Sequence, residues 1–127
     1  RLKQKRALKR WINDCVLAEN KKPGNINVIF CSDEYLLEMN RIHLDHDYYT
    51  DIITFDFTTE NVISGDLFIS FDRVQDNALQ NQIQPEKELY RVIIHGVMHL
   101  CGYKDKTKND ALLMRQQEEK CLRKITF

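Results

Sequence analysis

The sequence lacks several features that would set it apart from ordinary globular proteins. It has no apolar run long enough to cross a bilayer, no recognisable secretory signal, and no Cys-x-x-Cys pair among its four cysteines. A disulfide framework is therefore not expected, and the cysteines are interpreted as reduced, packed thiols of a cytoplasmic protein without a membrane partner. Repeats and low-complexity tracts are also missing, so residues 1–127, with 43% hydrophobic residues, are expected to form one domain.

The chain also lacks net charge, but its charges are unevenly distributed. Residues 1–24 carry eight basic and two acidic side chains, residues 25–90 carry three and thirteen, and residues 91–127 carry eight and four. A net charge of zero does not exclude a polyanionic partner, because a phosphate backbone meets a local basic face. The basic residues near the start of the chain are either a solubilising surface or a nucleic-acid-binding face.

The apolar pattern predicts an α+β fold, with about five helices packed on a small mixed β-sheet of about four strands. Helical spacing is found over residues 3–19, 32–42, 71–82, 85–100 and 108–124. Strand-like segments are found at residues 26–30, 52–57 and 62–70. The last two strands are expected to form an antiparallel hairpin with a bulge at Gly65, and Pro23-Gly24 is expected to interrupt the chain before the first strand.

The most informative segment is His95-Gly-Val-Met-His99-Leu-Cys-Gly-Tyr-Lys-Asp105. In a helix, two histidines four residues apart lie on one face, so both rings can reach one point. Gly102 can adopt the left-handed conformation that ends a helix, after which the chain can return Asp105 to the same point. Two imidazoles and a carboxylate, with a fourth position open to water, form the ligand set of a catalytic zinc site.

The histidine pair has two other interpretations. The rings could be ordinary core histidines satisfied by hydrogen bonds, since burying an unpaired polar ring costs about 1–3 kcal/mol. A zinc protease would carry Glu directly after the first histidine as its general base, but that position is Gly96. The helix is therefore zincin-like in its metal ligands but not in its chemistry.

These residues resemble the YbeY-type metal-dependent endoribonucleases, which act in ribosomal RNA maturation. The family pattern H-G-x-x-H-L-x-G-Y-D-H is matched from His95 to Tyr103 and then departs, because Lys104-Asp105 stands in place of Asp-His. Residues 50–55 (T-D-I-I-T-F) resemble the family's T-D-V-L-S-F, and residues 65–70 (G-D-L-F-I-S) resemble its G-D-I-x-I-S. The resemblance covers roughly residues 3–125.

The resemblance implies metal ligands at His95, His99 and Asp105, with Asp105 replacing the family's third histidine. Zinc is favoured as a single ion, and the harder oxygen ligand leaves Mn²⁺ or Ni²⁺ as alternatives. The added negative charge should make the metal a weaker Lewis acid and raise the pKa of its bound water. The family often carries a functional arginine where this chain has Leu44.

Four further side chains are candidates for holding the phosphates of the substrate. Those named as catalytic phosphate contacts are His46 and Arg41, and those named as substrate-binding are Arg91 and Lys104. The expected activity is hydrolysis of single-stranded RNA, with ribosomal RNA and a ribosomal subunit as partners. The alternatives are a non-catalytic RNA- or ribosome-binding protein with a structural metal, and a metal hydrolase of small molecules.

Overall fold

The computed structural model describes residues 4–46 and 48–127, and it confirms the α+β class with five helices. The elements follow in the order α1 (Lys5–Ala18), β1 (Lys22–Cys31), α2 (Asp33–Leu44), β2 (Ile52–Asp56), β3 (Val62–Ser70), α3 (Phe71–Gln80), α4 (Pro85–Leu100) and α5 (Lys108–Leu122). No helix in this part of the chain is long and apolar enough to cross a membrane.

Hydroxyl side chains begin three of the helices. The Oγ of Ser32, the Oγ of Ser70 and the Oγ1 of Thr107 each accept a hydrogen bond from the backbone N–H three residues later. Each bond satisfies one of the unpaired N–H groups of a first helical turn. α4 begins instead with Pro85, whose missing N–H costs nothing at the first helical position.

The sheet has three strands in the described part of the chain, one fewer than expected, in the order β1-β3-β2. β2 and β3 pair antiparallel, which confirms the predicted hairpin. β1 pairs parallel with β3, and the chain between these two strands passes through α2 and β2. The described residues contain no fourth strand, because the chain enters α3 directly at the end of β3 and forms only helices and connecting segments from there.

The expectation of a bulge at Gly65 was wrong, because Gly65 pairs regularly with Ile26 and the irregularity lies in β1, opposite Ser64. The pairing shifts between Pro23 and Ile26, so that two residues of β1 face Ser64 of β3. A Cβ at Gly24 would lie 2.3 Å from the Oγ of Ser64, so glycine is required there. Pro23 therefore does not interrupt the chain: an edge strand tolerates a missing N–H donor, and β1 begins at Lys22.

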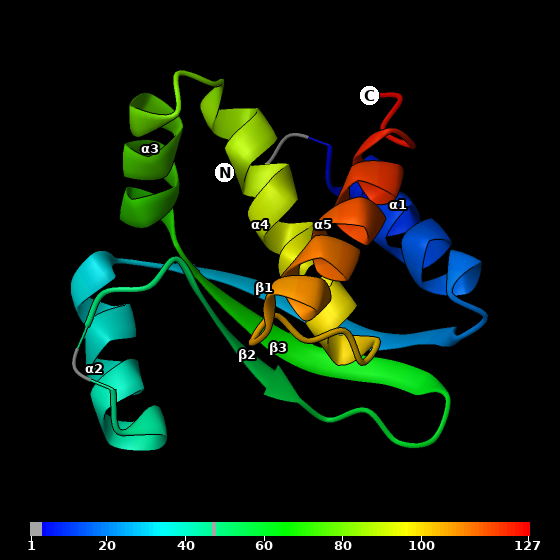
Figure 1. Cartoon of the computed structure of the whole chain (residues 1–127), viewed down its shortest axis with the longest axis horizontal. Coiled ribbons are helices and arrows are strands. Elements are labelled where there is room, and N and C mark those ends of the chain that lie inside the picture. The colour runs from blue at the N-terminus through cyan, green and yellow to red at the C-terminus, as the bar shows by residue number, and fades with distance from the viewer. Residues whose placement is uncertain (1–3, 47) are drawn as a thin grey trace.

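Helices lie on both faces of the sheet (Figure 1). α4 crosses the face that bears Ile52 and Leu67, and a Cβ at Gly96 would lie 2.7 Å from the Cδ1 of Ile52. α1 packs beside α4 on β1, and α5 packs along α4. Neighbouring strand residues point to opposite faces, so Ile53, which is 3% exposed, faces the other side, where α2 lies.

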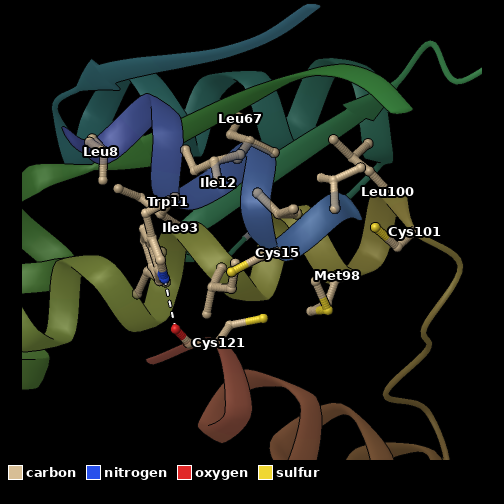
Figure 2. Close-up of a cluster of buried hydrophobic side chains, with 14 of the residues drawn as sticks. Leu8, Trp11, Ile12, Cys15, Leu67, Ile93, Met98, Leu100, Cys101 and Cys121 are labelled. Atoms are coloured by element: carbon tan, nitrogen blue, oxygen red, sulfur yellow. Dashed lines mark hydrogen bonds between the residues drawn. The ribbon is translucent and has the colours of Figure 1, made fainter. Parts of the chain in front are cut away.

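The main core lies among α1, α4, α5 and the sheet (Figure 2). The Nε1–H of Trp11 donates a 2.7 Å hydrogen bond to the backbone carbonyl of Cys121, which attaches α1 to the end of α5. On α5, Leu112 and Leu113 are exposed. The face turned inward consists of Met114, Glu118 and Cys121. A helix of low amphipathicity leaves this choice to its neighbours.

Candidate metal centre

The end of α4 folds back on itself at Gly102, as the sequence predicts. Gly102 has a φ of +108°, its N–H bonds to the carbonyl of His99, and the N–H of Tyr103 bonds to the carbonyl of Met98. This pair of bonds is the Schellman arrangement that closes a helix with a left-handed residue. It turns the following segment back toward the last turns of α4, where both histidines lie.

His95, His99 and Asp105 come together as expected from the sequence. The Oδ2 of Asp105 lies 3.3 Å from the Nε2 of His95 and 3.5 Å from the Nε2 of His99. One donor atom from each residue lies within 4.8 Å of the other two. Tetrahedral bonds of about 2.0–2.1 Å to zinc would separate neighbouring donor atoms by about 3.3 Å. The donor set therefore matches the dimensions of a small divalent cation.

Hydrogen bonds at the opposite ring nitrogens orient both histidines. The Nδ1 of His99 lies 3.0 Å from the backbone oxygen of Tyr103, and because a carbonyl can only accept, this nitrogen carries the proton. The Nδ1 of His95 makes a short hydrogen bond with the carboxylate of Glu118. In the neutral rings both Nε2 atoms are then unprotonated, and each directs a lone pair at Asp105, as metal coordination requires.

The charges around His95 affect its protonation. Burial lowers the pKa of His95, but the hydrogen bond and the charge of Glu118, with a smaller contribution from Asp105, outweigh burial and raise the pKa above its ordinary value of 6.5. Without a metal, a proton can therefore occupy the space between these acceptors. A cation binding there must displace it, so metal binding releases protons.

A second polar cluster lies at the other end of α4. The guanidinium of Arg91 bonds to the buried carboxylate of Glu88 through Nε at 3.0 Å and through Nη2 at 2.5 Å, and its Nη2 is 4.0 Å from the Oδ2 of Asp51. The hydrogen bond to Glu88 is the main cause of the raised pKa of Arg91. Burial raises the pKa of the Asp51 carboxyl, and the positive charge of Arg91 only partly offsets this effect.

The other predicted site residues are dispersed. Lys104 is exposed beside Asp105, and Arg91 lies one helical turn before His95 with its side chain 38% exposed. Arg41 forms an ion pair with Glu38 on α2, and the ring of His46 stacks on Tyr48 just after α2. Figure 1 shows α2 well apart from the segment that follows α4, so the structure does not bring Arg41 and His46 to the metal-ligand cluster.

Glu118 and the carbonyl of Tyr103, which complete the surroundings of the two rings, were not predicted from the sequence. A backbone carbonyl carries no sequence signal. Glu118 had one, since it shares a helical face with Met114 and Cys121, and a carboxylate on an apolar face needs a partner. The adjacent leucines Leu112 and Leu113 obscure this face in the sequence.

A helix with two histidines on one face, a carboxylate returned by a tight turn and an α+β scaffold define the class of metal-site hydrolases. Comparison with known proteins gives the family. The family model described as Endoribonuclease YbeY matches residues 1–126. Proteins named Endoribonuclease YbeY are 50% identical over 113 residues in Flavobacterium psychrophilum, covering 89% of this chain and 81% of the relative. The relative in Cytophaga hutchinsonii is 50% identical over 122 residues, covering 95% of this chain and 85% of the relative.

A solved structure agrees with this result. The solution structure of TM1509 from Thermotoga maritima superposes with a TM-score of 0.71 at 27% identity, covering 98% of this chain and 85% of that one. The chain belongs to the endoribonuclease YbeY family. It is an enzyme, a metal-dependent hydrolytic nuclease that acts on RNA, and its cluster of two histidines and one aspartate suits a divalent metal.

Proposed function

We propose that His95, His99 and Asp105 hold the catalytic metal of this endoribonuclease, and that the protein cleaves single-stranded RNA in ribosomal RNA maturation. One observation carries the proposal: two Nε2 lone pairs and a carboxylate oxygen converge at 3.3 Å and 3.5 Å. Three acceptors directed at one another repel unless a proton or a cation lies between them. The donor set is that of a zinc site, and Mn²⁺ and Ni²⁺ are the alternatives because Asp105 contributes a hard oxygen.

The chain's own residues fit such an ion. The last turns of α4 fix the spacing of the two rings, the hydrogen bonds at Nδ1 hold their orientation, and the turn at Gly102 delivers the carboxylate. Asp105 is 44% exposed on its side chain, so the ligand cluster opens to the surface, where a polymer can approach it. When bound, the metal would polarise a phosphodiester oxygen and lower the pKa of a water or hydroxyl nucleophile.

Arg91 and Lys104 are proposed to bind the phosphates beside the metal. Glu88 and Asp51 occupy the Nε and Nη2 side of the Arg91 guanidinium, while Nη1 takes no part in these contacts. A guanidinium held in this way can direct its remaining N–H groups at a phosphate with little loss of side-chain entropy. Lys104 adds a second positive charge next to Asp105. Both would stabilise the charge that develops at the cleaved phosphate.

Arg41 and His46 are proposed to contact the RNA strand away from the cleaved bond, since they lie with α2. A ribosomal subunit is proposed as the physiological partner and the cytoplasm as the site of action. The buried thiols of Cys15, Cys101 and Cys121 fit a reducing compartment. Residues 1–127 are proposed to act as one domain.

The experiment is metal loading combined with RNA cleavage. The protein is stripped with a chelator and reloaded with Zn²⁺, Mn²⁺ or Ni²⁺, and metal content and cleavage of a single-stranded RNA are measured for wild type, His99→Ala and His43→Ala. His43 is the matched control because it is a histidine outside the proposed ligand set, and its ring packs on Phe55 of β2. Wild type and His43→Ala should bind one ion and cleave, whereas His99→Ala should lose at least about 100-fold in both.

Two outcomes would contradict the proposal. Full metal loading and full cleavage by His99→Ala would remove this residue from the site. Loss of metal with cleavage unchanged would make the metal structural and place the chemistry elsewhere.

A further inference from the structure

The two histidines of α4 are held by groups of different kinds. His99 donates its Nδ1 proton to the backbone carbonyl of Tyr103, a neutral acceptor that no side-chain substitution removes. His95 bonds through Nδ1 to the carboxylate of Glu118, a charged side chain on another helix. The position of His99 therefore depends on the local turn, whereas the position of His95 depends on the packing of α5 against α4.

Glu118 is placed for this contact by the core. It is 6% exposed and lies on the inward face of α5 with Met114 and Cys121. One turn further along α5, the carbonyl of Cys121 accepts the hydrogen bond from Trp11, which attaches this end of the helix to α1 (Figure 2). The carboxylate therefore cannot turn outward to water without moving the helix.

A buried carboxylate needs a compensating partner, because removing its charge from water costs several kcal/mol. Within residues 4–46 and 48–127, His95 is the one side chain with which the structure gives Glu118 a hydrogen bond. Arg91 contributes at longer range, since the charge of Glu118 is among those that favour its protonated guanidinium. The buried carboxylate of Glu118 thus has as its hydrogen-bond partner a candidate metal ligand, His95.

We infer that Glu118 is the positioning residue of the metal site: it fixes the ring and the Nδ1–H tautomer of His95 and so raises the affinity of the cluster for its metal. The inference rests on the proposed metal centre. A carboxylate acceptor at the far nitrogen makes Nε2 a better electron donor, and loss of such an acceptor reduces metal affinity by about 10–100-fold. Glu118 acts through His95, because it bonds to Nδ1 and the Nε2 of the same ring faces Asp105.

The test measures metal affinity and the state of the His95 ring separately. Zn²⁺ dissociation constants are obtained by competition with a chromophoric chelator for wild type, Glu118→Gln, Glu118→Leu and the control Glu119→Gln, whose carboxylate lies on the exposed side of α5. In the metal-free proteins, at a pH high enough for the ring to be neutral, the ¹⁵N chemical shifts of His95 report its tautomer. Thermal unfolding confirms that each variant is folded.

Glu118→Gln keeps an acceptor and the shape of the side chain but loses the charge, so affinity should fall about 10-fold with the tautomer retained. Glu118→Leu removes the acceptor, so affinity should fall up to about 100-fold and the Nδ1–H preference should disappear. If Glu118→Leu does not fold, Glu118→Gln alone decides. A merely structural role for Glu118 would lower the unfolding temperature and leave both readouts unchanged.

The possible failures are distinguishable. If wild type and Glu119→Gln bind Zn²⁺ and folded Glu118 variants bind it equally well, the inference is overturned while the metal centre stands. If wild type itself binds no metal, the proposed function is overturned and the inference with it.

Discussion

The two ends of the polar face of α4 differ in how their polar side chains are paired. Near its start, the helix carries Glu88 and Arg91, which pair with each other while Asp51 adds a second carboxylate. Near its end it carries His95 and His99. Their Nδ1 atoms are hydrogen-bonded, and their Nε2 atoms face another acceptor, Asp105. In the first cluster, the closed end, a guanidinium lies between two carboxylates, whereas in the second, the open end, three acceptors face one another.

The difference distinguishes a self-paired polar cluster from the proposed metal site. Buried polar groups are expected to be hydrogen-bonded, and donors and acceptors alternate at the closed end as that rule requires. At the open end three acceptors converge, which is unfavourable for folding alone and favourable for holding a cation. The arrangement of donors and acceptors therefore argues for a ligand more directly than the mere presence of histidines.

The largest expected effect comes from removing the carboxylate of the open end. Asp105→Ala should reduce metal affinity by more than about 100-fold, because the site loses a direct ligand, and RNA cleavage should fall with it. Stability of the metal-free protein should change little, since this side chain is 44% exposed. Calorimetric metal titration and thermal unfolding measure the two effects.

Asp105→His is the matched variant for that experiment. It keeps a ligand and removes a negative charge, so metal should still bind and the pH of half-maximal cleavage should fall. Cleavage by metal-free Asp105→Ala at the wild-type rate would show that the open end is not the active centre.

Breaking the closed end should destabilise the fold and spare the metal. Arg91→Met leaves the carboxylate of Glu88, which is 1% exposed, without its partner, and should cost about 3 kcal/mol of unfolding free energy. Urea denaturation measures this cost, with Arg115→Met on the exposed side of α5 as the control. A loss of metal affinity equal to that of Asp105→Ala would contradict the separation of the two ends. Weaker RNA binding is expected, since Arg91 is proposed to contact phosphate.

Two glycines of the motif should respond differently to alanine. Gly102→Ala places a side chain at a φ of +108° and should cost about 1–3 kcal/mol through backbone strain, with weaker metal binding because the turn delivers Asp105. Gly96→Ala would bring a Cβ 2.7 Å from the Cδ1 of Ile52 and should cost about 1–3 kcal/mol through overpacking.

Metal affinity distinguishes these two causes. It should fall in Gly102→Ala and stay near the wild-type value in Gly96→Ala when each is measured well below its unfolding temperature. Equal affinity in both variants would mean that Asp105 finds the cluster without the left-handed turn.

The smallest effect concerns pH at the closed end. The pKa of Asp51 is raised in the folded protein above its ordinary value of 3.8, mainly by burial, so the native state holds this proton more tightly than the unfolded chain. The stability gained from that proton is complete below pH 3.8 and is lost as the pH rises through the folded pKa. Asp51→Asn should flatten this decline. Urea denaturation of both proteins across the acid range checks it, and parallel curves would exclude Asp51 as the cause.

The sequence predicted the parts of the structure that depend on neighbours along the chain. The hairpin and the turn at Gly102 were correct, because each depends on bonds within a few residues. The errors arose where distant elements decide. The bulge lies at Gly24 in β1 and not at Gly65, because the pairing of β1 with β3 decides its place. The described residues form three strands and not four.

The site divides in the same way. The spacing of His95 and His99 on one helix face is a property of helix geometry, and the return of Asp105 follows from one left-handed residue, so the sequence by itself determined the three candidate ligands. The sequence did not predict the groups that accept hydrogen bonds from the two rings, Glu118 and the carbonyl of Tyr103. Which face of α5 turns inward, and hence that Glu118 rather than Glu119 meets His95, was decided only by packing among α1, α4 and α5, because side chains far apart in the chain compete for the same buried space.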